Sequence, residues 1–187
     1  MNIGKSLVAA AALGLLAGCN QSQTEAPPAD KPAAEAVQPD AATTGILASL
    51  TAAPLQRADA AKIMKERHDG MEKVGKTMKQ LGRAVKADPL DTAAVKTGAA
   101  TIAQLSAKAA NWFPAGTGPD VGKTGAKPEI WQQPKDFTAK LKAFQTAANN
   151  FNAAARGGDA AAVKASFGEL GKGCKSCHDS YRSKMKH

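Results

Sequence analysis

The 187-residue chain has little of what most metal and disulfide sites are built from: three cysteines, three histidines and one tyrosine. A structural zinc site needs four cysteine or histidine ligands, but His68 and His187 are scattered and no second cysteine pair exists. The chain also has no convincing alternation of apolar and polar residues, and no βαβ pattern of the kind that surrounds a thioredoxin-like cysteine pair. These absences exclude a zinc domain and a thioredoxin-like enzyme, and they leave a helical, alanine-rich protein.

Long apolar runs are also scarce. The run over residues 7–16 follows a single early lysine and is too short for a permanent membrane anchor. It leads into Leu16-Ala17-Gly18-Cys19, which has the form of a bacterial lipobox. We therefore interpret residues 1–18 as a lipoprotein signal peptide and Cys19 as the lipidated first mature residue. A plain secretory signal ending near Gly18 is the alternative.

This interpretation places the protein in the periplasm, lipid-anchored to a membrane. The residue after Cys19 is Asn20 rather than Asp, which favours the outer membrane by analogy with enteric bacteria. Residues 20–43 contain almost no large apolar side chains and cannot bury enough surface to fold. We predict a lipidated, disordered tether over residues 19–43 and one domain with a hydrophobic core over residues 44–187.

Within that domain, four stretches repeat apolar residues every three or four positions, which is typical of amphipathic helices. They run from about Pro54 to Lys86, from Asp91 to Asn111, from Pro134 to Gly157 and from Asp159 towards the end of the chain. The pattern predicts an all-α fold, an antiparallel four-helix bundle. The connection over residues 112–133 holds both tryptophans, and we expect its aromatic side chains to anchor it to one end of the bundle. A ligand lid is the alternative.

The pentapeptide Cys174-Lys175-Ser176-Cys177-His178 is the attachment signal of a c-type haem. Its two thiols can add across the haem vinyl groups, and the adjacent imidazole can ligate the iron. All three groups project from one helix face. With Cys19 lipidated, no cysteine is left for a disulfide. We predict one covalent haem c with His178 as the proximal iron ligand.

Three segments resemble the cytochrome c-prime family, the class II c-type cytochromes: Gly173 to Arg182, Phe113 to Trp131 and Arg67 to Lys79. The resemblance implies a haem held by the last helix and faced by the first. In one branch of the family a bulky apolar residue covers a five-coordinate iron that binds small gases. In the other branch a methionine of the first helix is the second ligand of an electron carrier.

Met71 occupies the position that matches this second ligand, in register with Gly75 and Met78. Two alternatives stay open: Met71 is only a core residue, or His68 is the second ligand instead. We expect a carrier of single electrons with His178 and Met71 as axial ligands, not an enzyme. The alternative is a five-coordinate cytochrome that binds nitric oxide or carbon monoxide, and weak peroxidase activity is a third reading.

The formal net charge is +9, and cations gather near the attachment site: Lys172, Lys175, Arg182, Lys184 and Lys186. Such a surface steers encounters with an acidic redox partner protein. We expect membrane contact through the lipid and no nucleic-acid partner. A homodimer through the first two helices is implied by the resemblance, and a monomer is the alternative.

Overall fold

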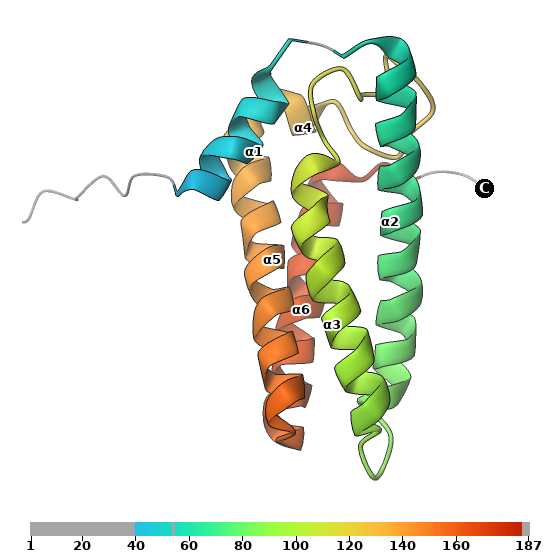
Figure 1. Cartoon of the computed structure of the whole chain (residues 1–187), viewed down its shortest axis with the longest axis vertical. Helices are drawn as coiled ribbons and strands as arrows, with labels where there is room; N and C mark the ends of the chain where they lie inside the picture. Colours follow the sequence, from blue (N-terminus) through green and yellow to red (C-terminus); the bar gives the residue numbers. More distant parts are fainter. Residues whose placement is uncertain (1–39, 54, 185–187) are drawn as a thin grey trace, which may run out of the picture. The chain divides into compact units, whose positions relative to one another are not determined.

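The structure, a computed structural model, describes residues 40–53 and 55–184. The expected signal peptide, Cys19 and most of the expected tether lie outside the described residues. The four long helices are α2 (Arg57–Ala84), α3 (Thr92–Lys108), α5 (Pro134–Gly157) and α6 (Ala160–Tyr181) (Figure 1). Three short elements complete the fold: α1 (Ala41–Thr51), the 3-10 helix η1 (Ala109–Asn111) and α4 (Glu129–Gln132). The all-α prediction is confirmed, because the described part of the chain holds helices and a single isolated bridge.

The long helices run alternately up and down (Figure 1). The connections from α2 to α3 and from α5 to α6 are short, whereas that from α3 to α5 spans residues 109–133. In the bundle, α6 packs on α5, α5 on α3 and α3 on α2. In contrast, α2 and α6 make almost no close backbone approach. The helices therefore pack closely on three sides of the bundle. On the fourth side α2 and α6 are more widely spaced, and we call this the open side. None of the described helices is long and apolar enough to cross a membrane.

The core is formed mainly by α3 and α5. The apolar positions that repeat over residues 134–157 are all buried in α5: Phe137, Leu141, Phe144, Ala148, Phe151 and Ala155. On α2 the repeat of Met71, Val74, Met78 and Leu81, with His68 on the same face, predicts a buried stripe that is only partly correct. Val74 and Leu81 are buried, whereas Met71 and Met78 are half-buried and His68 is exposed. The physical reason is that α2 turns a different face inwards, one that includes a buried arginine.

Arg67 is only 4% exposed and fixes the long connection to α2. Its guanidinium donates hydrogen bonds to the carbonyl of Trp112, to the hydroxyl and carbonyl of Thr117 and to the hydroxyl of Thr124, all between 2.8 and 3.0 Å. It also lies 5.2 Å from the ring centre of Phe113. Burial lowers the pKa of Arg67 to about 10, so the side chain stays charged at neutral pH. The expected anchoring of the connection is confirmed, because Trp112 and Phe113 are buried, and the buried cation of Arg67 adds to it.

Helix α1 is absent from the four predicted helices and begins before residue 44, where we expected the domain to start. Asp40 caps it by accepting a hydrogen bond from the Thr43 amide at 2.7 Å. Ile46 and Leu50 are buried where α1 packs on α5. The helix is short and rich in alanine and threonine, so its sequence pattern is too weak to separate it from the tether.

Candidate functional site

Helix α6 carries the pentapeptide. The helix begins after Gly158, whose φ of 80° ends α5, and Asp159 caps it by accepting a hydrogen bond from the Ala162 amide. It continues unbroken through the motif to Tyr181. Cys174 and Cys177 are half-buried free thiols that pack against the core. The helix therefore presents both thiols on its inward side, as the sequence predicts.

We call the side of the bundle between α2 and α6 the α2–α6 seam. The half-buried apolar side chains that the two helices pack against the core are Met71 and Met78 of α2 and Phe167, Cys174 and Cys177 of α6. Four of these five carry sulfur, which is a soft, polarisable ligand or nucleophile. The structure therefore brings the Met71 helix and the attachment motif to the same open side.

Glycines leave additional space on both helices of the seam. Gly75 lies on the stripe between Met71 and Met78, and Gly171 lies between Phe167 and Cys174. A Cβ atom built at either glycine meets no atom within 4 Å. Gly173 differs, because its Cβ would lie 3.5 Å from the Cα atom of Phe144. Of these two glycines near the motif, Gly171 leaves room beside the seam, whereas Gly173 lies against α5, where a Cβ atom would make an ordinary van der Waals contact.

The protonation states suit covalent attachment and metal ligation. Burial raises the pKa of the Cys174 thiol and raises that of Cys177 to about 11, so both are neutral thiols at pH 7. The His178 side chain is exposed, yet desolvation by neighbouring atoms lowers its pKa and Arg182 lowers it further. Its imidazole is therefore neutral at physiological pH, which is the form that binds a metal.

These residues fit a covalently held haem. Two thiols one helical turn apart and an adjacent neutral imidazole lie beside a side of the bundle that its own backbone leaves open. A thioether on the facing helix, that of Met71, suits haem iron as a second ligand. His68 is exposed, which makes it a poorer candidate than the half-buried Met71.

The end of α6 is held in place by contacts that the sequence does not reveal. The Tyr181 hydroxyl donates a 2.5 Å hydrogen bond to Asp136 of α5, and its ring packs edge-on against Phe137. The Lys127 amide donates to the carbonyl of Tyr181, and the Ser183 amide donates to that of Gly125. Asp136 has no signal in the sequence beyond its place in the first turn of a helix. These contacts fix the helix end just beyond His178.

Some of the cations near the motif are already paired with acidic side chains of the same helix. Lys172 forms an ion pair with Glu169 at 2.7 Å, and Lys175 forms one with Asp179 at 2.6 Å. Both pairs are on the exposed face of α6. Lys186 lies outside the described residues. The expected positive surface around the attachment site is therefore partly neutralised by its own helix.

Comparison with known proteins agrees with this site. The family model described as "Cytochrome C'" matches residues 62–182. Cytochrome c' of Alcaligenes xylosoxydans xylosoxydans is 40% identical over 96 residues, which cover 51% of this chain and 72% of that protein.

Two solved structures are similar to the bundle. A cytochrome c' with a ligand-controlled dimer dissociation is 31% identical, with a TM-score of 0.61 over 71% of this chain and 100% of that one. A nitric oxide complex of a cytochrome c' variant from Alcaligenes xylosoxidans is 32% identical, with a TM-score of 0.60 over the same shares. The chain therefore belongs to the cytochrome c' family, and its cofactor is a covalent c-type haem.

Proposed function

We propose that this protein carries single electrons, with His178 and Met71 as the two axial ligands of its haem iron. The observation that carries the proposal is the half-buried thioether of Met71, which lies on the same open seam as the two thiols of α6. When bound, the haem supplies an iron that takes up and releases one electron. Two protein ligands keep the same coordination in both oxidation states and leave no position for a substrate.

In this proposal, different residues of the chain attach the haem, ligate its iron and hold the two helices that carry the ligands. Cys174 and Cys177 attach the cofactor, which keeps it from dissociating. The neutral imidazole of His178 would bind the iron from α6, and the thioether of Met71 would bind it from α2. The hydrogen bond between Tyr181 and Asp136 holds the end of α6, while Arg67 holds the connection against α2. Both anchors restrain the two helices that bear the ligands, and a rigid site lowers the reorganisation that accompanies electron transfer.

The second candidate is a cytochrome that binds nitric oxide or carbon monoxide on an open iron. Two observations favour it. A structurally similar cytochrome c' variant has been solved as a nitric oxide complex. In this chain, Met78 lies half-buried on the same helix as Met71, so a methionine on this face can be a simple packing residue.

Optical spectra of the purified holoprotein separate the two candidates. The electron carrier predicts a sharp, low-spin reduced spectrum that carbon monoxide barely changes, because Met71 already fills the sixth position. A broad, high-spin reduced spectrum that shifts at once on adding carbon monoxide would instead establish the open iron.

We further propose that the protein is a periplasmic lipoprotein, anchored through Cys19 to the outer membrane and assembled as a homodimer. The lipobox sequence supports the anchor, and the ligand-controlled dimer of a similar cytochrome c' supports the dimer. Mass spectrometry of the mature N-terminus tests the lipid, with Cys19→Ala as the control. Density-gradient separation of the membranes tests the location, and sedimentation of the domain tests the dimer.

A further inference from the structure

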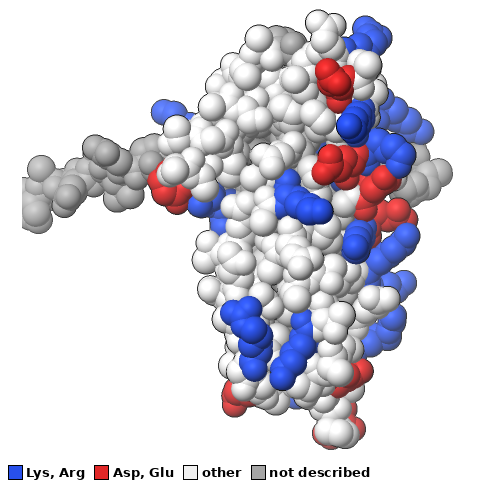
Figure 2. All heavy atoms as spheres, in the orientation of Figure 1, with Lys and Arg blue, Asp and Glu red and all other residues white. Residues whose placement is uncertain are grey.

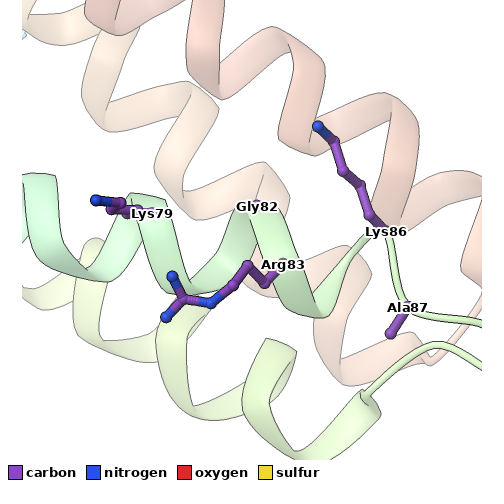
Figure 3. A pocket seen from close by; sticks show the side chains of 5 residues that line it. All are labelled: Lys79, Gly82, Arg83, Lys86 and Ala87. Atoms are coloured by element: carbon purple, nitrogen blue, oxygen red, sulfur yellow. The ribbon is translucent and has the colours of Figure 1, made fainter.

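A shallow hollow lies at the C-terminal end of α2, away from the attachment motif. It has a volume of about 600 Å³ and is lined by Lys79, Gly82, Arg83, Lys86 and Ala87 (Figure 3). Gly82 and Ala87 have little or no side chain and form the floor of the hollow, and the three cationic side chains lie at its edge. Apart from α2 itself, the nearest neighbour of a Cβ atom built at Gly82 would be the Cζ atom of Phe167 in α6, at 4.0 Å. The floor of the hollow therefore faces α6, at the lower end of the α2–α6 seam.

The charge of this end of α2 is not compensated. In the described residues, the side chains of Lys79, Arg83 and Lys86 form no ion pair, unlike Lys172 and Lys175 beside the motif. From Lys73 to Ala87 the chain contains five cations and no acidic residue, and one of the five, Lys76, forms an ion pair with Glu72. Figure 2 shows acidic and basic side chains mixed over the upper half of α2 and mostly basic ones below. The hollow therefore gathers three cations without an ion pair, whereas two of the cations beside the attachment site, Lys172 and Lys175, are paired.

The hollow is better suited to a protein surface than to one small anion. From Lys79 to Lys86 the cations span seven residues, or about 10 Å along the helix. They are exposed and long, so they converge on no single point, and no buried donor is aimed into the hollow. Several spread cations match several spread carboxylates, which is the pattern of a transient, salt-dependent protein contact.

The hollow is also close enough to the seam to matter for electron transfer. Phe167, which faces Gly82, lies seven residues before Cys174, or about 10 Å along α6. We propose that Lys79, Arg83 and Lys86 form the docking surface for an acidic partner protein that exchanges electrons at the lower end of the α2–α6 seam. This inference rests on the proposed electron carrier and names the surface through which it meets its partner.

The test compares two holoprotein variants of equal charge. The first is K79E/R83E/K86E. The control, K62E/K108E/K135E, reverses three exposed lysines near the opposite end of the bundle. The probe is a fluorescent decaglutamate peptide, with binding measured at low and high salt. We expect the first variant to lose at least about tenfold in affinity and the control less than about threefold. Equal losses in the two variants would overturn the proposal, because net charge alone would then explain binding.

Two further readouts sharpen the test. The rate of oxidation of the reduced protein by ferricyanide should fall at least about fivefold more in the first variant than in the control, since the anion would approach through the same surface. Binding to vesicles of anionic phosphatidylglycerol provides the second readout. If the first variant lost vesicle binding but kept the peptide affinity of the parent, the proposal would be overturned in favour of a membrane surface. The haem spectrum of the first variant should equal that of the parent. A high-spin iron in the parent protein would contradict the proposed ligation by Met71. The peptide affinities of the two variants would still decide whether the docking surface exists.

Discussion

The closed side of the bundle, between α3 and α5, and the open side, between α2 and α6, are built from different residues. Ile102 and Phe151 on the closed side are completely buried, and most of the buried residues of α3 and α5 are aliphatic or aromatic. On the open side the seam residues are half-buried, and four of the five contain sulfur. The difference indicates that the closed side provides the folding free energy, whereas the open side provides the groups that hold the cofactor.

The strongest test of this division removes the attachment site. In the double variant Cys174→Ser/Cys177→Ser we expect complete loss of covalent haem, measured by acid–acetone extraction and by mass. Helix content should be largely retained, because the α3–α5 core does not use these side chains. Lys175→Ala, a change inside the same pentapeptide, is the control and should keep its haem. A double variant that retains covalent haem would contradict the assignment of both cysteines.

The next largest effect, on the stability of the fold, should come from substituting Arg67, which anchors the long connection to α2. Arg67→Met leaves the carbonyls of Trp112 and Thr117 without their donor, so we expect a loss of about 2–4 kcal/mol in the free energy of unfolding. Urea denaturation measures this change. The exposed Arg83, substituted in the same way, should change stability by less than about 0.5 kcal/mol. Equal effects of the two substitutions would mean that the buried hydrogen bonds do not hold the connection.

Alanine substitutions at two glycines of α2, five residues apart, allow a comparison of the packed face and the open face of one helix. A Cβ atom at Gly70 would lie 3.1 Å or less from three atoms of the Trp112 ring, so Gly70→Ala should cost about 1–3 kcal/mol. A Cβ atom at Gly75 meets nothing within 4 Å, and Gly75→Ala should stabilise the haem-free protein by up to about 1 kcal/mol. Thermal unfolding of both variants in the cysteine-free background measures this. A loss of stability for Gly75→Ala would show that the seam is closed without the cofactor.

The smallest effect concerns α1, which rests on the closed side. The Thr43 amide and the Lys142 ammonium lower the pKa of Asp40 to about 2. A lowered pKa stabilises α1 above pH 4, and this contribution is lost as the pH falls towards 2. Asp40→Ala should loosen α1 at pH 6 and leave the rest unchanged, as followed by the amide resonances of residues 41–51. An equal response throughout the bundle would mean that α1 does not move independently.

Much of the fold and the centre of the site can be predicted from sequence, because both depend on spacing along one helix. Pro134, Gly158 and Asp159 mark the helix ends correctly, and the spacing of Cys174 and Cys177 predicts their common inward side. The burial of Arg67 cannot be predicted this way, since its hydrogen-bond acceptors lie 45 to 57 residues away. The same holds for the packing of α1 on α5. In contrast, the pairing of Lys172 with Glu169 and of Lys175 with Asp179 follows from spacings of three and four residues on one helix.

The central claim is that Met71 ligates the iron and that Met78, on the same seam, does not. Reduction potentials and spectra of the holoproteins Met71→Ala and Met78→Ala test it most directly. The account predicts that Met71→Ala becomes high-spin, binds carbon monoxide rapidly and has a changed potential, while Met78→Ala keeps the parent spectrum. A parent-like spectrum and potential in Met71→Ala would contradict the account and leave the methionine as a packing residue.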